Sequence, residues 1–157
     1  MSSAEPRTME AQVMEVRAIE LIRRVRYGRL ATTRRALPFL AVARHLVIDG
    51  RVVLRMHSGL GHHESCDGTV VAYGVDNFDA AATGEGGSED SGALWSVQFT
   101  GPAEVVHPTE EQRTLFGAAP LQVNGEPFEP VYLRLDPHFV TMHTLDFHAT
   151  QPSHHTA

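Results

Sequence analysis

The stretch from Pro38 to Ser58 reads PFLAVARHLVIDGRVVLRMHS, and it decides the fold class. Its first half, Pro38–Ile48, is a long run of apolar and β-branched residues, which is typical of a strand. Asp49-Gly50 predicts a tight type I′ turn, because glycine tolerates a positive φ angle. Arg51–Ser58 follows as the partner strand. The stretch therefore predicts an antiparallel hairpin.

Patterns on both sides of this hairpin extend the sheet. Apolar residues at helical spacing predict a helix over residues 11–27, with Gly28 as a plausible stop. The T-x-x-Q sequence from Thr109 to Gln112 has the form of a capping box and predicts a second, short helix. Further strands are expected at residues 29–33, 69–76, 94–106, 131–135 and 139–145. Within 94–106 we expect a bulge or bend at Gly101-Pro102.

The order of these elements favours a mainly β fold of one domain. No helix separates the strands in the middle of the chain, so the sheet should be antiparallel and close into a barrel without exposed edges. The domain is expected to span residues 11–148. Residues 1–10 should form a flexible leader and residues 149–157 a flexible tail. Residues 79–93 are small, polar and acidic and predict a flexible surface loop. Residues 118–130 are expected to form an irregular connection.

Composition narrows the classes of function. The 157 residues carry a formal net charge of -6, which argues against a general nucleic-acid-binding protein. No apolar run approaches the roughly 20 residues that cross a bilayer, so we expect no membrane insertion. The first residues, MSSAEPRTMEAQ, lack the apolar core of a secretion signal, and we expect a cytoplasmic protein. A single cysteine excludes a disulfide framework.

The basic residues are unevenly distributed. All thirteen are arginines, and eleven of them lie within residues 1–55. One interpretation is a solvated basic helix facing an acidic remainder. The other is a basic rim that attracts a phosphate-bearing small molecule. The absence of lysine excludes a pyridoxal phosphate enzyme that works through a lysine Schiff base.

The densest group of chemically active side chains is the sequence HSGLGHHE at residues 57–64, where a strand ends in a glycine-bearing loop. Glycines let backbone N–H groups converge on an anion, and the serine hydroxyl and imidazoles add donors. The segment could therefore be a phosphate cradle, or a hairpin loop that happens to contain histidines. His57, His62, His63, Glu64 and Cys66 could all bind a metal, but their spacing matches no recognised zinc motif.

Six segments in consistent order, between about residues 15 and 147, resemble one protein family. They are 28–33 (GRLATT), 38–42 (PFLAV), 49–58 (DGRVVLRMHS), 71–76 (VAYGVD), 95–106 (WSVQFTGPAEVV) and 133–141 (LRLDPHFVT). Together they resemble the pyridoxamine 5'-phosphate oxidase-like flavoproteins. The resemblance implies a six-stranded antiparallel split β-barrel with an N-terminal helix and a second short helix. It also implies a homodimer with FMN at the subunit interface.

The resemblance assigns roles to particular residues. The flavin phosphate would be held by His57, Ser58, His62 and His63, with Arg55 as an alternative that depends on the hairpin register. The ring and ribityl chain would touch Val42 and Ala43, together with Trp95 of the partner subunit and Ser96 of the partner subunit.

This chain departs from the family pattern in the phosphate loop. His62-His63 stands where relatives carry arginine or lysine, and Met142-His143 stands where Gly-Arg is usual. FMN binding could then be weaker and dependent on pH, the site could be tuned to another ligand, or the cofactor could be lost. The expected function is FMN-dependent oxidoreduction of a small organic substrate. The alternative is a non-catalytic module of the same fold that holds haem, a deazaflavin coenzyme or another ligand.

Four other residues carry open interpretations. His45 or His57 could move a proton during a flavin reaction, although His45 is more typical of a hydrogen-bonded wall residue. Cys66 is expected to be a free thiol, with a nucleophile beside His63 as the alternative. Trp95 could be a core aromatic or a residue at the cofactor or dimer interface.

Overall fold

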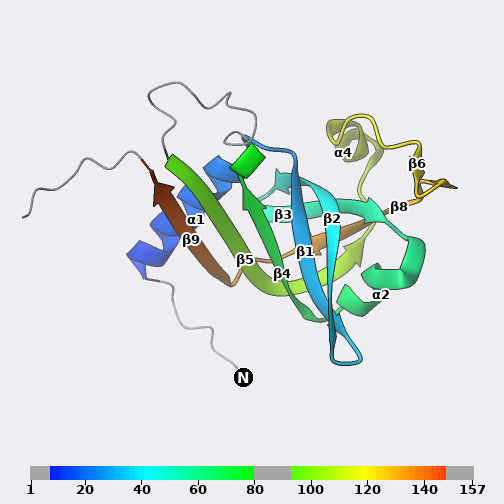
Figure 1. Cartoon of the computed structure of the whole chain (residues 1–157), viewed down its shortest axis with the longest axis horizontal. Coiled ribbons are helices and arrows are strands. Elements are labelled where there is room, and N and C mark those ends of the chain that lie inside the picture. Colours follow the sequence, from blue (N-terminus) through cyan, green and yellow to red (C-terminus); the bar gives the residue numbers. More distant parts are fainter. Residues whose placement is uncertain (1–7, 80–92, 148–157) are drawn as a thin grey trace, which may run out of the picture.

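The computed structural model describes residues 8–79 and 93–147, which form a closed antiparallel barrel with an N-terminal helix (Figure 1). The elements are α1 Met9–Ile22, β1 Tyr27–Arg34, β2 Leu37–Ile48, β3 Arg51–His57, η1 Gly59–Gly61, α2 His62–Cys66, β4 Val70–Asp76, β5 Ala93–Val106, α4 Glu110–Leu115, β6 Gln122–Val123, β7 Glu126–Pro127, β8 Pro130–Leu135 and β9 Phe139–Asp146. Six strands close the ring in the order β1-β2-β3-β8-β5-β4, and β9 pairs with the first part of β5. The predicted fold class is confirmed.

The β2–β3 hairpin forms as the sequence predicted. Asp49 and Gly50 have φ angles of 53° and 75°, so both lie in the left-handed region that a type I′ turn requires. This turn pairs Ile48 with Arg51 and, four residues further along, Arg44 with Arg55. The register of the turn therefore decides which side chains of β2 and β3 lie across from each other.

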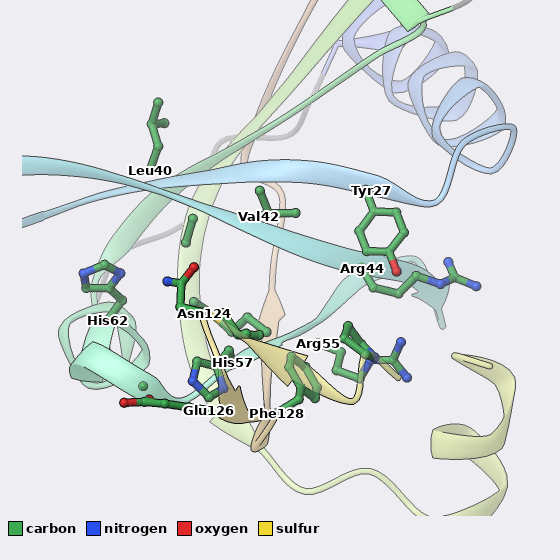
Figure 2. A pocket seen from close by; sticks show the side chains of 15 residues that line it. Tyr27, Leu40, Val42, Arg44, Arg55, His57, His62, Asn124, Glu126 and Phe128 are labelled. Carbon is green, nitrogen blue, oxygen red and sulfur yellow. The ribbon is translucent and has the colours of Figure 1, made fainter. Parts of the chain in front are cut away.

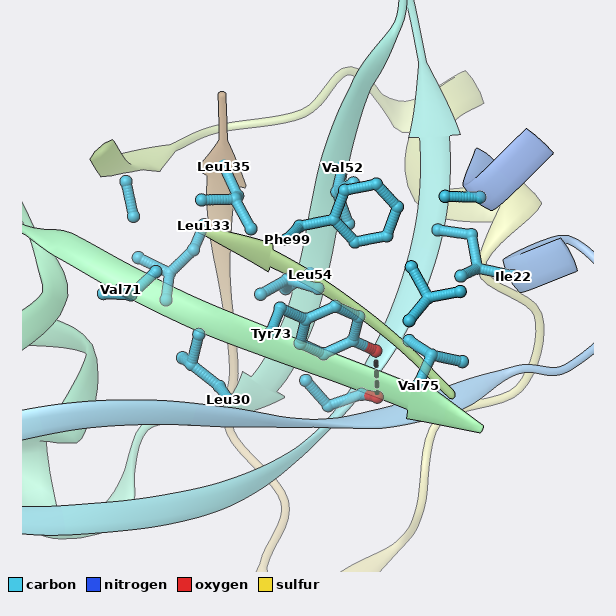
Figure 3. Packing of buried hydrophobic residues seen from close by; sticks show 14 of the residues in the cluster. Ile22, Leu30, Val52, Leu54, Val71, Tyr73, Val75, Phe99, Leu133 and Leu135 are labelled. Carbon is cyan, nitrogen blue, oxygen red and sulfur yellow. Dashed lines mark hydrogen bonds between the residues drawn. The ribbon is translucent and has the colours of Figure 1, made fainter. Parts of the chain in front are cut away.

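The core fills the barrel and is capped at one end by the last turn of α1 (Figure 3). Tyr73, Phe99, Leu54 and Leu133 are fully buried inside the ring, and Ile22 packs on them from α1. Burial of such apolar side chains is the main source of stability for a domain of this size.

The predicted helix over 11–27 is shorter at its C-terminal end. Pairing of β1 with β2 starts at Tyr27, opposite Arg44, so the chain must leave the helix before that residue. The backbone N–H groups of Arg24 and Val25 bond three residues back, to Leu21 and Ile22, which closes the helix in a tight turn. At the other end α1 starts at Met9, so the last two residues of the predicted leader, residues 1–10, belong to the helix. Residues 1–7 lie outside the described residues.

Strand β5 runs through Gly101-Pro102 without interruption, contrary to the sequence-based expectation. At this point the strand changes partner along one edge, from Phe139 in β9 to Leu135 in β8. Gly101 is required there because the carbonyl of Asp136 occupies the space that a Cβ would need. Gly101 therefore allows the backbones of β5 and of Asp136 to pack closely, and it does not interrupt the strand.

Two connections contain more structure than expected. The loop after β3 forms the single turn η1 and then α2. Residues 118–130, expected to be irregular, include the small β6–β7 hairpin around Asn124 and Gly125, whose φ angles are 52° and 82°. The helix α4 and its capping box at Thr109 are confirmed.

Two sequence expectations concern segments that are largely or wholly outside the described residues: the acidic surface loop, of which 80–92 are not described, and the tail 149–157. Among the described residues, none of the helices has the length and apolar character needed to cross a bilayer.

Candidate functional site

The candidate site is a cavity of about 540 Å³ on the outer face of the β2–β3 hairpin, closed on one side by the β6–β7 segment (Figure 2). We call it the hairpin pocket. Its lining residues are Tyr27, Leu40, Ala41, Val42, Arg44, Arg55, Met56, His57, Gly59, His62, Pro120, Val123, Asn124, Glu126 and Phe128. A volume of several hundred Å³ with an apolar lining and a few polar groups is typical of small-molecule sites.

The middle of the hairpin pocket is apolar because β2 turns alternate side chains outward. Leu40 and Val42 are 70% and 62% exposed, whereas Ala43, the residue after Val42, points into the core and is 1% exposed. Phe128, in the segment that follows β7, also lines the pocket. Thus Val42 lines the pocket, while Ala43 lies on the other face of the strand.

One end of the pocket is formed by His57 and His62. The His57 ring stacks on Phe128, with ring centroids 5.6 Å apart, and its Nδ1 accepts a hydrogen bond of 3.1 Å from the backbone N–H of Glu129. That bond places the proton of the neutral imidazole on Nε2. The His62 ring packs on Phe39 with centroids 4.7 Å apart.

Ser58 and His63 are next to these residues in the sequence but do not line the pocket. The Ser58 hydroxyl donates to the Glu129 carboxylate at 3.3 Å, and its backbone N–H donates to the Glu129 carbonyl. His63 has a buried Nδ1 without a hydrogen-bond partner, and its Nε2 lies 3.9 Å from the Glu64 carboxylate. The structure therefore brings together two of the four residues of the predicted phosphate cradle.

The other end of the pocket is formed by two arginines that are cross-strand partners. Arg55 is 4% exposed, and its Nη1 and Nη2 donate to the carbonyls of Gly117 and Ala118 at 3.0 and 3.2 Å. Its guanidinium lies 5.4 Å above the centre of the Phe116 ring. The Nε of Arg55 is buried and has no hydrogen-bond partner.

Arg44, the second of these arginines, was missed by sequence reasoning. Its Nε donates to the carbonyl of Phe116 at 3.1 Å, and its Nη1 donates to the carbonyl of His45 at 2.7 Å. Burial, and then the positive charges of Arg26 and Arg55, lower the pKa of Arg44. The Asp49-Gly50 turn was the signal that could have found this residue, because a two-residue turn there pairs residues 44 and 55.

Trp95 and Ser96 lie away from the hairpin pocket. Trp95 is 7% exposed and belongs to the core of its own subunit, which is the first of its two interpretations. Ser96 is half-buried on β5, opposite Asp76 of β4. Within one subunit, neither residue contacts the lining of the pocket.

His45 is a hydrogen-bonded wall residue inside the barrel. Its Nε2 lies 2.8 Å from the carbonyl of Ile22, and its Nδ1 lies 2.6 Å from the Tyr73 hydroxyl. Because a carbonyl only accepts, Nε2 carries the proton in its contact with Ile22. The single proton of the Tyr73 hydroxyl has two acceptors within reach, the Nδ1 of His45 and the carbonyl of Ala43 at 3.1 Å. Burial lowers the pKa of His45 and raises the pKa of Tyr73. The pair links the end of α1 to the barrel.

The described residues contain no group of three or more metal-binding side chains. Cys66, the only cysteine, is fully buried, and burial raises the pKa of its thiol. A buried thiol with a raised pKa is a poor nucleophile. The structure therefore favours the free, unreactive thiol.

The hairpin pocket suits a flat, partly aromatic cofactor with an anionic group. Leu40, Val42 and Phe128 offer apolar contact area, and hydrogen-bond donors stand at both ends.

Comparisons with known proteins agree with this fold. The sequence model of a protein family described as "Pyridoxamine 5'-phosphate oxidase" matches residues 15–144. An uncharacterized protein of Mycobacterium tuberculosis is 37% identical over 100 residues, a stretch that covers 60% of this chain and 59% of that protein. The chain thus spans about three fifths of that relative's length.

Two solved structures from Mycobacterium smegmatis share the fold. An FAD-binding protein superposes with a TM-score of 0.60 at 18% identity, and the match covers 84% of this chain and 95% of that one. A haem-binding protein superposes with a TM-score of 0.53 at 16% identity, covering 92% of this chain and 60% of that one. Proteins of one architecture thus hold two different cofactors.

Proposed function

The chain belongs to the pyridoxamine 5'-phosphate oxidase family, and from this premise we propose that it binds a flavin coenzyme, with FMN the first candidate, in the hairpin pocket. The observation that carries the proposal is the arrangement of that pocket: an apolar floor at Leu40 and Val42 between two polar ends. An isoalloxazine ring is flat and largely apolar, whereas its phosphorylated side chain needs hydrogen-bond donors.

The phosphoryl group of the flavin would lie at the end formed by His57 and His62. The His57 Nε2 carries a proton while its Nδ1 is held by the Glu129 N–H, so the ring is fixed in orientation. His62 is fixed by its contact with Phe39. The ring system would extend along β2 over Val42 towards the arginines.

A bound flavin would supply hydride transfer, which makes oxidoreduction of a small organic substrate the proposed activity. The residues of this chain would bind and orient the coenzyme, and Leu40, Val42 and Phe128 would exclude water from one face of the ring. His57 would hold its Nε2 proton towards the phosphoryl group, at the end of the pocket away from the ring. His45 is sealed in the barrel wall and takes no part in this chemistry.

We also propose that the active form is a homodimer. A second, smaller hollow shares Tyr27 and Val42 with the hairpin pocket, so one continuous outer surface of β1 and β2 joins the two. Tyr27, Leu40 and Val42 are between 49% and 70% exposed on it. A second copy of the chain that covers this surface would complete the flavin site and bury these side chains.

The test is a titration of the purified protein with FMN, followed by quenching of flavin fluorescence. Val42→Glu places a carboxylate on the pocket floor and should abolish or strongly weaken binding, while Val70→Glu, at an equally exposed valine of β4 outside the pocket, should not. FAD and a deazaflavin coenzyme are titrated in parallel. Binding that is unaffected by Val42→Glu would contradict the proposed site.

A second candidate, haem binding without catalysis, is favoured by the two imidazoles that line the same cavity, His57 and His62. Imidazole is a common axial ligand of haem iron. Titration with haemin distinguishes the two candidates, because haem bound through histidine gives an intense Soret band that disappears in the His57→Ala, His62→Ala double variant. A flavin site would give no such band.

A further inference from the structure

Helix α1 carries an apolar face that the barrel does not cover. Its buried side chains, Ala18, Leu21 and Ile22, lie in its second half and pack on the barrel. In its first half, Met9 and Val13 are 80% and 67% exposed. Side chains four residues apart lie on the same face of a helix. The two exposed residues therefore form one apolar stripe.

This stripe borders a hollow of about 410 Å³ between α1 and β9, the strand along which α1 lies (Figure 1). We call the lining of this hollow the α1 patch. Its members are Met9, Glu10, Val13, Met14, Arg17 and Met142. The α1 patch and the hairpin pocket have no residue in common. Methionine side chains adapt to the surface they meet, so three of them around one exposed apolar hollow suit a binding surface.

Glu10 and Arg17 are the two charged residues of the α1 patch. Seven residues make almost two full turns of a helix, so both lie on the same side of α1, about 10 Å apart along its axis. Both are exposed. None of the ion pairs among the described residues involves either of them. Each therefore presents an unpaired charge at the edge of the hollow.

The opposite charges make the α1 patch complementary to itself. The midpoint between Glu10 and Arg17 falls between Val13 and Met14. A two-fold axis at this point, perpendicular to α1, places a second α1 antiparallel to the first. Glu10 then meets Arg17 of the partner subunit, and Arg17 meets the partner's Glu10. Val13 lies beside Met14 of the partner subunit, so apolar surface is covered between the two ion pairs, as a symmetric contact between identical chains requires.

The same charges disfavour a membrane as the occupant. Helices that lie on anionic lipid carry lysine or arginine around their apolar face. Here Glu10, which lies beside the exposed Met9, would be repelled by such a surface. A second copy of the chain matches both charges.

From this arrangement we infer that α1 is a self-association surface, at which two copies of the chain pack their α1 helices antiparallel. This contact is separate from the homodimer proposed over β1 and β2, and it does not rest on the flavin function. One pair of short helices covers less than the roughly 800 Å² per partner of a standard interface. We therefore expect weak association, with a dissociation constant between about 10 μM and 1 mM.

The experiment is sedimentation velocity on the full-length protein across that concentration range. Val13→Glu places a charge at the centre of the contact and should weaken association at least about tenfold. Val70→Glu, at an equally exposed valine of β4 outside the α1 patch, should change it less than twofold. Both valines are exposed, so both variants should fold.

A charge exchange tests the antiparallel arrangement. Glu10→Arg and Arg17→Glu each bring like charges together twice across the two-fold axis, and each should weaken association about tenfold. The double variant, and an equal mixture of the two single variants, should recover it to within about threefold, because opposite charges face each other again. Recovery in the mixture requires that α1 of one chain contacts α1 of another.

Association that is unaffected by Val13→Glu over the whole range would overturn the inference, and would mean that another segment or another protein covers the α1 patch. No recovery in the mixture would overturn the antiparallel contact. The homodimer over β1 and β2 changes the starting mass but not the direction of these effects, so its failure is distinguishable from failure of the α1 contact.

Discussion

The histidine end and the arginine end of the hairpin pocket differ in how the chain builds them. His57 and His62 lie five residues apart in the sequence, on a strand end and the helix that follows it. Arg44 and Arg55 are eleven residues apart and meet only because the turn between β2 and β3 sets their register. The first end can be recognised as a local motif, whereas the second is a product of the fold.

The two ends also differ in how firmly they are fixed. The imidazoles of His57 and His62 are held by one ring contact each and, for His57, one backbone hydrogen bond. The guanidinium groups of Arg44 and Arg55 make four hydrogen bonds to main-chain carbonyls. We therefore expect the arginine end to contribute to stability as well as to binding, and the histidine end to contribute mainly to binding.

The largest effect should follow from Arg55→Ala. The substitution leaves the carbonyls of Gly117 and Ala118 without their donors and removes the contact with Phe116. Loss of a buried, hydrogen-bonded charged group should lower the free energy of unfolding by about 3 kcal/mol, measured by urea denaturation. Arg51→Ala, on the same strand but exposed, is the control. Equal effects of the two variants would show that the arginine end is not structural.

Binding of FMN should respond next most strongly, to Val42→Glu. A carboxylate on the apolar floor repels the flavin phosphate and must be desolvated under the ring, so affinity should fall by at least about tenfold, or 1.4 kcal/mol. Fluorescence titration measures the change. Val70→Glu adds the same charge outside the pocket and should leave the affinity within about twofold.

Acidification should destabilise the protein through His45, which belongs to neither end of the pocket. Burial lowers its pKa in the folded state, so below the ordinary histidine value of about 6.5 the unfolded chain binds a proton that the folded chain does not. Stability is therefore retained above that pH and lost as the pH falls through it, by at most about 1.4 kcal/mol per pH unit. The measurement is urea denaturation between pH 7.5 and pH 5.

The control for this pH dependence is a pair of glutamine variants. His45→Gln should remove part of the loss, whereas His107→Gln, at an exposed histidine, should leave it unchanged. Identical pH profiles for the wild type and His45→Gln would contradict the assignment to His45.

The smallest expected effect separates two adjacent histidines. His62 lines the pocket and His63 does not, so His62→Ala should weaken FMN binding about threefold to fivefold and His63→Ala by less than twofold, as expected for loss of a hydrogen bond of ordinary strength. Isothermal titration calorimetry resolves such a difference. If His63→Ala has the larger effect, the phosphoryl group lies on the other side of α2 from the hairpin pocket.

The sequence predicted the barrel well because its evidence is local. The Asp49-Gly50 turn and the capping box at Thr109 each depend on neighbouring residues, and each forms as predicted. The errors concern places where contacts distant in sequence decide the conformation. Gly101 is packed against the carbonyl of Asp136, which no pattern within 94–106 could reveal.

The candidate site was only partly predictable for the same reason. Val42 was selected through the family resemblance, and His57 and His62 from a histidine-rich turn; all three line the pocket. That Ser58 is engaged by Glu129 depends on a contact 71 residues away along the chain. The hairpin around Asn124-Gly125 brings Glu126 and Phe128 to the pocket. The Asn-Gly dipeptide is typical of a tight turn, but residues 118–130 were interpreted as an irregular connection.

The most direct test of the central claim is a crystal structure of the protein soaked with FMN. The account predicts the flavin ring over Val42 and its phosphoryl group within hydrogen-bond distance of His57 and His62. A flavin bound outside the hairpin pocket, or one whose phosphoryl group lies on Arg55, would contradict it.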